Sequence, residues 1–551
     1  MLKVCKILIY TTLLLLTTSF LFSQTSSKKF QITSVKYNIQ GITRESVLDE
    51  GLHIDRDKIF KDQEEFDEYL SWLRGDLDNN RIFKETSVQV FYGNRDPSTG
   101  ITPVELLIST TETHNKIVVP YPRINSNTGT QIRVKLRDYN FMGSMQMFDL
   151  DFTYNYYSQE KPKRHVVGLY TGFMIPFKVG DYNIYWTNSI DVNKTLKHDY
   201  KPFVGLASNV NVSVPVDKKS GMNFSLYGSY THETNKNQYA SIGTSISYSR
   251  ALTDNLSLGI SESHILTRNP DYKDDTHYFT NVIGVSFPFK VGTIPNFATV
   301  VWTPSFSLSR NWDVKALSQD RLSNTRSDMI EHRDLKGPRF TFGHSIGAGR
   351  IEWVGKYKRG FSLSFGQFWT YNFHTKNVPQ PYFTLNTDLR VPGERIALYN
   401  RNYWYYSLEG NTTTFAERMR GIKDNDALIS YNMLVMNFDL PIKLLSTDFE
   451  EWEFPFGSKL KKLDMEVHFA PFMDVALGFN PNTGTNFLIA DGYYAGGFEF
   501  LVYPYHMKSV IGRLSFGIDL ARTILPGRLV NKSWRENNRR WELTFGLGAF
   551  Y

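Results

Sequence analysis

The feature that most constrains this chain is a strict alternation of apolar and polar side chains beyond residue 130. In FDLDFTYNYY (148–157), aromatic and aliphatic residues take every second position, and Asp, Thr and Asn fill the others. LDMEVHFAPFMDVAL (463–477) alternates in the same way, with Glu466, His468 and Asp474 on its polar face. Because successive side chains of a β-strand point to opposite faces, both segments are predicted strands with one apolar and one polar face.

The polar faces of these segments carry full charges, which restricts where the strands can lie. The core of a soluble barrel would not tolerate ionised groups, whereas a water-filled lumen surrounded by lipid does. About 18 alternating segments can be distinguished. We therefore predict a membrane all-β fold, an antiparallel transmembrane β-barrel over residues 130–551. The alternative is a stack of soluble β-sandwiches, which the lack of a second linker disfavours.

Composition argues against other classes of protein. Aromatic residues make up 15% of the chain and charged residues 21%, and the mean hydropathy is -0.35. A helical membrane protein needs runs of roughly 20 apolar residues, and disordered chains are poor in aromatic residues. The net charge of +7 is small and scattered, without basic runs interleaved with aromatic residues. We therefore expect no nucleic acid among the partners.

Residues 1–23 are predicted to be a secretory signal peptide. Lys3 and Lys6 precede an apolar stretch over residues 7–22, and small residues follow it. The alternative, an N-terminal membrane anchor, is disfavoured because the apolar stretch is short and interrupted by Thr and Ser. The single cysteine, Cys5, lies in this segment. The exported chain would then contain no cysteine, which avoids wrong disulfides in an oxidising periplasm.

Residues 24–114 are predicted to form a separate small α+β domain. The second of its two helices places Phe66, Leu70 and Leu77 on one face, and Asp62 with Glu65 is a plausible capping box. The expected elements are a strand over 30–41, helices over 44–52 and 64–80, and strands over 87–93 and 104–110.

The order and size of these elements resemble a POTRA domain, the polypeptide-transport-associated module. Three strands on two helices would leave a sheet edge open. An open edge can pair with an extended polypeptide by β-augmentation, and the alternative is a merely solvated edge. A linker over residues 115–129 is expected to connect this domain to the barrel.

The chain ends on WELTFGLGAFY (541–551), an alternating strand that finishes with an aromatic residue. Its polar Thr544, Gly546, apolar Ala549 and terminal Tyr551 resemble the C-terminal signal that the barrel assembly machinery reads. This resemblance implies an outer-membrane barrel.

Four stretches occur in a fixed order along the barrel segment: RDYNFMGSMQ (137–146), ERMRGIKDNDAL (417–428), PFMDVALGF (471–479) and GRLSFGIDLAR (512–522). They resemble the first hairpin, the inward-folded loop, the following strand and the penultimate strand of the BamA/TamA superfamily of POTRA-plus-barrel proteins, also called the bacterial surface antigen family. The resemblance implies a 16-stranded barrel in the outer membrane of a diderm bacterium. The POTRA-like domain would lie in the periplasm.

The same resemblance implies a loop, around residues 392–430, that folds into the barrel. The family motif there is valine-arginine-glycine-aromatic, and this chain has Arg420 and Gly421 but departs at Met419 and Ile422. Asp474 holds the place of the acidic residue that faces the arginine, and Glu466 is an alternative on the same face. A guanidinium can hold a carboxylate with two bonds, and glycine permits a turn with positive φ.

The barrel is expected to close through a weak seam between its first strand, taken as 130–137, and its last, 541–551. Gly546 and Gly548 would loosen the last strand because they bring no side chain to the pair. The expected facing residues are Ile132, Val134 and Leu136 on the first strand, and Phe545 with the two glycines on the last.

No enzymatic site is expected. GHSIG (343–347) matches the nucleophile-elbow pattern around Ser345, but that motif needs a strand, a turn and a helix, and here it lies inside an alternating strand. The histidines show no close metal-ligand spacing. We expect no catalytic residue, metal or cofactor.

The leading functional hypothesis is an outer-membrane insertase or translocase for client polypeptides. It would act by β-augmentation in the periplasm and by opening the seam toward outer-membrane lipid. Periplasmic or lipoprotein partners would bind the POTRA-like domain. The alternatives are a secretion pore for one dedicated exoprotein, as in two-partner secretion, and a passive channel.

Overall fold

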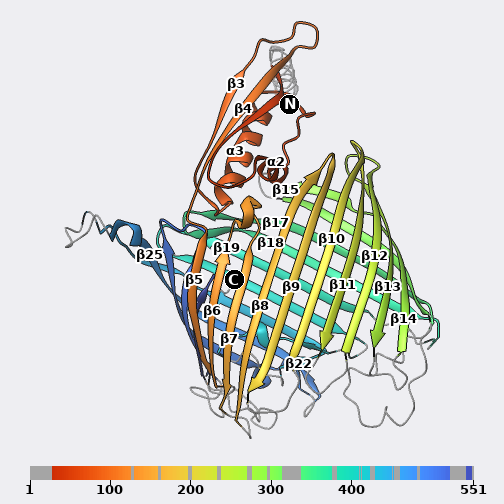
Figure 1. The fold of residues 1–551 in the computed structure, drawn as a ribbon, viewed down its shortest axis with the longest axis vertical. Helices are drawn as coiled ribbons and strands as arrows, with labels where there is room; N and C mark the ends of the chain where they lie inside the picture. Colours follow the sequence, from red (N-terminus) through yellow and green to blue (C-terminus); the bar gives the residue numbers. More distant parts are fainter. Residues whose placement is uncertain are drawn as a thin grey trace, which may run out of the picture. The chain divides into compact units, whose positions relative to one another are not determined.

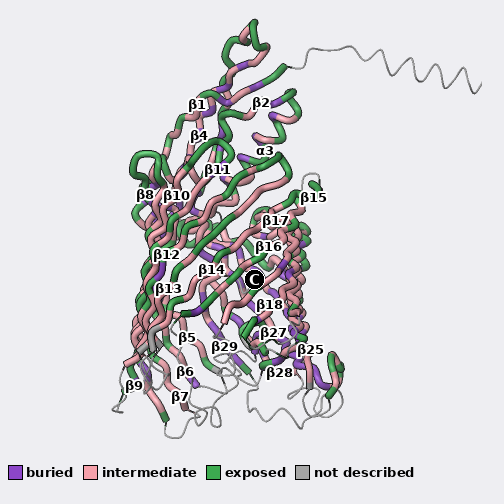
Figure 2. Tube along the Cα trace, turned by 90° about the vertical axis from the view of Figure 1, so that its right-hand side faces the viewer, coloured by how far each residue is buried: buried purple, intermediate pink, exposed green. Residues whose placement is uncertain are grey.

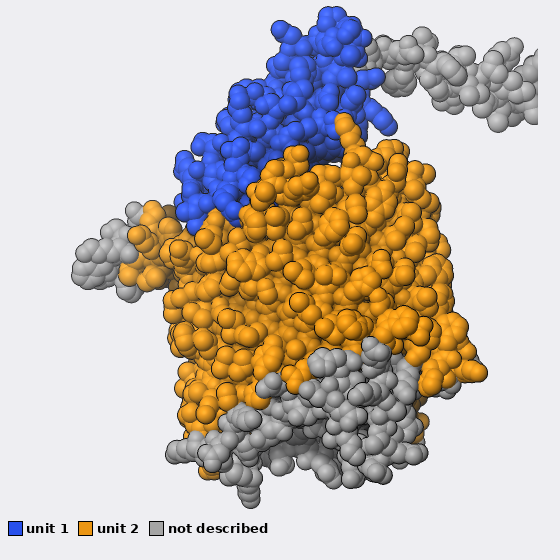
Figure 3. Space-filling view, turned by 45° about the vertical axis from the view of Figure 1, so that its right-hand side comes forward, with its two compact units in different colours: residues 1–112 blue, residues 113–551 orange. Residues whose placement is uncertain are grey.

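The computed structural model divides the chain into two compact units, residues 1–112 and 113–551 (Figure 3). The predicted signal peptide lies outside the part of the chain that the structure describes. The described residues are 28–125, 129–158, 163–196, 202–232, 238–269, 276–294, 298–312, 337–374, 376, 381–408, 410, 412–421, 428–449, 451, 460–480, 484–520 and 541–548.

The first unit is a four-stranded sheet with two helices. The strand order is β2-β1-β4-β3, and only β1 and β4 run parallel. It therefore contains one short strand, β2, more than the three strands expected. Its elements are β1 (Lys29–Gln40), α2 (Glu45–Leu52), β2 (Ile59–Phe60), α3 (Gln63–Asn79), β3 (Phe83–Tyr92) and β4 (Ile101–Glu112).

Helix α3 forms where its apolar periodicity predicts it. Asp62 caps its first turn, because a side-chain oxygen of Asp62 accepts a hydrogen bond of 2.9 Å from the backbone N–H of Glu65. Its buried face consists of Phe66, Leu70, Leu73 and Leu77, and this face packs against the sheet. Within the described part of the chain, strand β3 pairs with β4 alone, so one side of β3 is an open sheet edge there.

The second unit is a closed antiparallel β-barrel (Figure 1). Short 3-10 turns, η1 (Phe141–Gly143), η4 (Ala416–Arg418), η5 (Lys461–Leu463) and η6 (Ile489–Asp491), lie in its connections. Its strands are β5 (Lys116–Asn125), β6 (Gly129–Asp138), β7 (Phe148–Tyr157), β8 (Arg164–Val179), β9 (Tyr182–Leu196), β10 (Phe203–Asp217), β11 (Ser220–His232), β12 (Gln238–Ala251), β13 (Ser257–Asn269), β14 (Thr276–Ser286), β15 (Phe289–Ile294), β16 (Ala298–Trp312), β17 (Arg339–Val354), β18 (Tyr357–Asn372), β19 (Tyr382–Pro392), β20 (Ala397–Ser407), β23 (Asn432–Asp439), β24 (Ile442–Ser446), β25 (Met465–Asn480), β26 (Thr485–Asn486), β27 (Tyr493–Pro504), β28 (Gly512–Asp519) and β29 (Trp541–Leu547).

The barrel has 20 strands, so the expectation of 16 is wrong. Strands β14 and β15 both pair with β16 and form one interrupted strand, as β23 and β24 do opposite β25. The two-residue β26 pairs only with β25. The number 16 came from the family resemblance alone, whereas the alternation in the sequence indicated a larger barrel.

Two strands lie where no strand was predicted. Residues 116–125, expected to be a linker, form β5, and residues 397–407, expected to belong to the inward loop, form β20. Pro120 and Pro122 hide the strand character of β5, because proline is rare inside strands. In β20, consecutive aromatic residues at 403–406 obscure the alternation.

The predicted alternation is reproduced in the orientation of the side chains. In β7, Phe152 is 54% exposed on the outer face, whereas Asp151 is only 5% exposed. Buried residues gather along β25 and the strands that follow it (Figure 2). A closed barrel with an apolar outer face and polar inner face is the architecture of outer-membrane proteins, which supports that location. Among the described helices, none has the length and apolar character needed to cross a membrane.

Candidate functional site

The loop between β20 and β23 folds against the inner wall of the barrel. Its two-residue strands β21 (Thr413–Thr414) and β22 (Ile429–Ser430) pair with each other. Three apolar side chains of the loop, Phe415, Met419 and Leu428, are buried. They pack against residues of β23, β25 and β27, namely Met433, Val435, Ala476, Tyr493 and Ala495. This apolar cluster holds the loop in place before any charged contact is considered.

Arg420 donates three hydrogen bonds to the carboxylate of Asp474. Its Nε donates to Oδ2 at 3.0 Å, its Nη2 donates to Oδ1 at 2.6 Å, and its backbone N–H donates to Oδ2 at 2.8 Å. Its Nη1 donates to Asp439 and lies 3.8 Å from Glu499. The guanidinium carbon also lies 3.7 Å from the centre of the Phe472 ring.

This cluster is fully enclosed, so its electrostatics are strong. The side chain of Arg420 is 4% exposed, and those of Asp474 and Glu499 are 0% exposed. Burial by itself lowers the pKa of the guanidinium, but the carboxylates of Asp474 and Asp439 outweigh burial and raise this pKa well above its ordinary value. Arg420 is therefore charged, and its departure would leave three buried carboxylates without their main counter-charge.

Gly421 brings the loop backbone against β28. Its φ of 76° lies in the left-handed region, and a Cβ there would lie 2.9 Å from the carbonyl carbon of Gly517. Conversely, a Cβ on Gly517 would lie 3.0 Å from the Cα of Gly421. Both glycines are needed for this close approach. Met419 is buried in the apolar cluster, and Ile422 lies outside the described residues.

The seam of the barrel joins β29 to β5, not to residues 130–137. Among the residues that the structure describes, three register pairs form it: Asn125 with Glu542, Ile124 with Leu543, and Arg123 with Thr544. The predicted partners Ile132, Val134 and Leu136 belong to β6, which pairs with β5 and β7. This part of the seam prediction is wrong because β5 was taken for a linker.

Prolines explain why the seam stops after three pairs. The same register would place Phe545 opposite Pro122 and Leu547 opposite Pro120, but no pairing is formed there. In contrast, the β5–β6 register continues through both prolines for ten residues. Since proline has no N–H to donate, the prolines must turn their missing donors toward β29.

Gly546 and Gly548, which were expected to loosen the last strand, have different surroundings. Gly546 pairs with Arg513 of β28, and a Cβ there would lie 2.5 Å from the ring of Tyr121. Gly548 has a φ of 83° and donates its N–H to the carbonyl of Ile511 at 2.7 Å. Thr544 lies in β29, whereas Ala549 and Tyr551 of the predicted terminal signal lie outside the described residues.

An ion pair crosses the seam on its inner side. Nε of Arg123 lies 3.2 Å from Oε1 of Glu542, and the hydroxyl of Thr544 donates to the same oxygen at 2.9 Å. Both charged side chains are mostly buried, at 15% and 9% exposure.

The start of β5 has a second attachment. The hydroxyl of Thr113 donates to the carbonyl of His506 at 2.7 Å and accepts from the backbone N–H of Lys508 at 3.1 Å. The first strand is therefore tied at both ends and unpaired with β29 between them.

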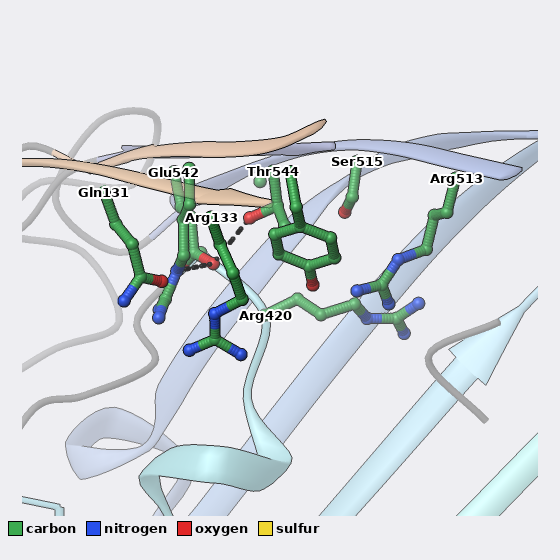
Figure 4. A pocket seen from close by; sticks show the side chains of 11 residues that line it. Gln131, Arg133, Arg420, Arg513, Ser515, Glu542 and Thr544 are labelled. Carbon is green, nitrogen blue, oxygen red and sulfur yellow. Dashed lines mark hydrogen bonds and ion pairs between the residues drawn. The ribbon is translucent and has the colours of Figure 1, made fainter. Parts of the chain in front are cut away.

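The loop tip and the seam line one polar cavity of about 120 Å³ (Figure 4). Its lining comes from four strands beside the seam and from the loop tip: Tyr121, Arg123, Gln131, Arg133, Arg420, Gly421, Arg513, Ser515, Gly517, Glu542 and Thr544. The arrangement places a rigidly anchored loop directly behind the weakest contact of the barrel wall.

Glu466 does not take part in the loop anchor. Its Oε2 lies 3.1 Å from Nζ of Lys443, and its Oε1 lies 2.6 Å from Nε2 of His468. Ser345 lies within the continuous strand β17, without the helix that a nucleophile elbow requires. Among the described residues, no group of His, Cys, Asp or Glu is placed to hold a metal ion.

Sequence reasoning missed several residues of this site. Asp439, Glu499, Arg123 and Glu542 had not been singled out. Asp439 and Glu499 carried a weak signal, because both are carboxylates within segments that alternate like barrel strands. The Arg123–Glu542 pair had none, since β5 was not recognised as a strand.

Comparisons with known proteins give no family. No family model matches the chain, and no curated protein matches it. Among solved structures, CdiB from Acinetobacter baumannii is 11% identical, with 94% of this chain and 74% of that chain covered and a TM-score of 0.40. BamA from Haemophilus ducreyi lacking POTRA domains 1-3 is 11% identical over 94% and 84%, with a TM-score of 0.29. The siderophore receptor PirA from Pseudomonas aeruginosa is 10% identical over 93% and 91%, with a TM-score of 0.38.

Proposed function

We propose that this protein inserts or translocates client polypeptides at the outer membrane by opening the seam between β5 and β29. The observation that carries the proposal is the length of the seam, three register pairs. The neighbouring ladders are longer: seven pairs join β28 to β29, and ten join β5 to β6. The wall therefore opens most easily at the seam.

The unpaired part of the seam offers a template for a client strand. Residues 545–547 of β29 pair with β28, and no described residue pairs with them on the β5 side. An extended client segment can add to such an edge by main-chain hydrogen bonds, each contributing about 0.5–1.5 kcal/mol. The edge of β5 is less receptive because of Pro120 and Pro122, so β29 is the side on which a client strand would begin to pair.

The inward loop braces the β29 side of the seam. It is fixed to β23 through Asp439, to β25 through Asp474 and to β28 through the contact with Gly517. The proposal is that β5 moves away while the C-terminal strands stay in place, with the Arg123–Glu542 pair as the contact that must break.

The first unit would capture clients before insertion. Its edge strand β3 is open on one side, and Phe91 on this strand is 50% exposed. An extended polypeptide can pair with such an edge. A periplasmic place for this unit, its identity as a POTRA domain and lipoprotein partners remain parts of the same proposal.

A disulfide across the seam tests the function. Ile124 and Leu543 are direct register partners, and opposite residues of two strands have Cα atoms about 4.5–5.5 Å apart, within disulfide range. Cys5 is replaced by serine throughout. Oxidation of Ile124→Cys/Leu543→Cys should stop client insertion, and reduction should restore it.

The matched control is Ile132→Cys/Tyr154→Cys, which joins register partners of β6 and β7 away from the seam. Its oxidation should leave activity unchanged. A secretion pore or a passive channel conducts through the lumen, so full activity of a quantitatively cross-linked seam would contradict the proposal and favour a pore.

A further inference from the structure

The end of the β17–β18 hairpin leaves the barrel wall. Strand β17 pairs with β16 only as far as Gly347, although it continues to Val354. Strand β18 pairs with β19 only from Gly360 onward. Among the described residues, 348–354 of β17 pair only with β18, and 357–359 of β18 pair only with β17. The tip of the hairpin therefore has no ladder to either neighbouring strand.

Two glycines allow the tip to bend where it leaves the wall. Gly349 has a φ of 117° and Gly360 a φ of 133°, values that L residues rarely adopt. A Cβ on Gly349 would lie 2.1 Å from the carbonyl oxygen of Phe361, and one on Gly360 would lie 1.9 Å from that of Arg350. The bend therefore requires glycine at both positions.

The bent tip reaches the inner face of β25 and β27. The ring of Tyr357 lies 4.8 Å from that of His468, and Trp353 packs edge-on against Tyr503 at 6.5 Å. In the barrel, β19, β20 and the β23–β24 strand separate β18 from β25. The tip therefore crosses the inner face of the intervening strands to reach β25 and β27.

Hydrogen bonds fix the tip along its path. The hydroxyl of Tyr357 donates to the carbonyl of Arg395 at 2.6 Å, and the backbone N–H of Lys358 donates to the hydroxyl of Tyr399 at 2.7 Å. Tyr357, Tyr399 and Ala397 are buried together. The contacts are thus specific to this position of the hairpin.

Tyr357 packs into a site that we call the socket, formed by His468, Tyr503 and Glu466. His468 is 0% exposed, and its ring lies between Tyr357 and Tyr503, both at 4.8 Å. Its Nε2 lies 2.6 Å from Glu466, which also contacts Lys443. The Nδ1 atom of His468 has no hydrogen-bond partner among the described residues. Release of the tip would let water reach this nitrogen, which favours opening.

The hairpin and the inward loop enter from opposite ends of the barrel. Along antiparallel strands the connections alternate between the two rims, so the 355–356 turn and the β20–β23 loop lie at different rims. Both meet the inner face of β25, the loop at Asp474 and the hairpin at His468. The inner face of β25 is thereby contacted by segments from both rims.

We infer that residues 350–359 are a gate that narrows one mouth of the barrel and opens by swinging back toward the wall. The wall has places for the base of the hairpin: continued in register, residues 348–350 would face 298–300 of β16 and residues 358–359 would face 391–392 of β19, and these wall residues have no partner on that side among the described residues. Opening would admit hydrophilic solutes or a polypeptide to the lumen. This inference does not depend on the proposed insertion of clients at the seam.

Conductance of the full-length protein in planar lipid bilayers tests the gate. Trp353→Ala/Tyr357→Ala removes both aromatic contacts and should raise the single-channel conductance several-fold. Val354→Ala is the matched control, since Val354 lies on the same tip and its side chain is 42% exposed. Faster migration of unboiled samples on a denaturing gel shows that each variant has folded.

A second pair of variants opens the gate without touching the socket. Gly349→Val/Gly360→Val forbids the bend and should give the same increase in conductance. Gly355→Asn is its control: this turn residue has a φ of 63° with no atom near a Cβ, and asparagine tolerates that conformation.

Conversely, a short thiol cross-linker between Tyr357→Cys and His468→Cys should hold conductance at or below the parent level. Folded gate variants with parent conductance would overturn the inference.

Discussion

Arg420 and Asp474 are joined by three hydrogen bonds, two from the guanidinium and one from the backbone N–H of Arg420. A single carboxylate thus fixes both the direction of the side chain and the position of the loop backbone. The contact joins an extended loop to a barrel strand that lies 54 residues further along the chain. It explains how a loop with few elements of its own keeps one position inside a wide barrel.

Removal of this cation should inactivate the protein more than it destabilises the barrel. Arg420→Ala leaves Asp474, Asp439 and Glu499 buried without their main counter-charge, at a cost of about 3–5 kcal/mol. The many ladder hydrogen bonds of the wall should keep the barrel assembled. Client insertion should therefore fall sharply, while the amount of heat-modifiable barrel on a gel falls only modestly.

Two variants sharpen this test. Arg420→Lys keeps the charge but cannot form the paired bonds, so its activity should lie between those of the parent and Arg420→Ala. In a double-mutant cycle with Asp474→Ala, the coupling should be about 1–3 kcal/mol. Additive effects would show that the two residues do not act together.

The approach of Gly421 to Gly517 gives a prediction about packing. Gly517→Val places side-chain atoms where the Cα of Gly421 now lies and should push the loop tip off β28, at a cost of about 1–3 kcal/mol. The displaced loop should become a site of trypsin cleavage next to Arg418 or Arg420. Gly512→Val on the same strand is the control, because its Cβ meets Val502 at an ordinary 3.5 Å. Equal protease resistance in both variants would contradict the contact.

Replacement of the prolines of β5 should stabilise the barrel, unlike the substitutions above. Pro120→Val/Pro122→Val supplies two N–H donors that can pair with β29 and extend the seam. The temperature at which the barrel unfolds should rise, and client insertion should slow. Pro215→Val in β10 makes the same replacement away from the seam and should change neither quantity. Faster insertion by the β5 variant would contradict the assignment of the prolines as the weak point.

Much of the wall was predictable because the physics that creates it is local. A strand with lipid on one face and a lumen on the other must alternate, and β7 and β25 do so residue by residue. Where this rule was broken, prediction failed: β5 contains Pro120 and Pro122, and β20 has aromatic side chains on both faces. One missed strand then moved the predicted seam by a whole strand, from β5 to β6.

The site was predictable only in part, for a different reason. Arg420 and Asp474 were named from a family resemblance and from the chemistry of a guanidinium with a carboxylate. Asp439 and Glu499 complete the same cluster from other strands, and their convergence depends on barrel closure, which no local pattern encodes. The gate depends on the bend at Gly349 and Gly360, and glycine in a strand indicates equally well a bulge, a bend or a close contact.

The last prediction concerns the ion pair that closes the seam. Arg123 and Glu542 are brought together on the inner side of β5 and β29, and they add a charged contact to only three register pairs. Both side chains are largely buried, so removal of one partner leaves the other desolvated and should destabilise the closed seam by about 3–5 kcal/mol. Arg123→Ala and Glu542→Ala should each speed the exchange of β5 away from β29. The measurement is the rate at which a maleimide modifies Leu543→Cys in the Cys5→Ser background, because Leu543 is paired with Ile124 in the closed seam. The double variant should react no faster than the faster single variant. Once one charge is gone, the remaining charge opposes closure, and its removal relieves that cost.

Arg133→Ala is the control, as this arginine lines the same cavity but contacts Asp151 of β7 rather than β29. Labelling rates that add independently in the double variant, or that rise equally in the control, would show that the pair does not hold the seam.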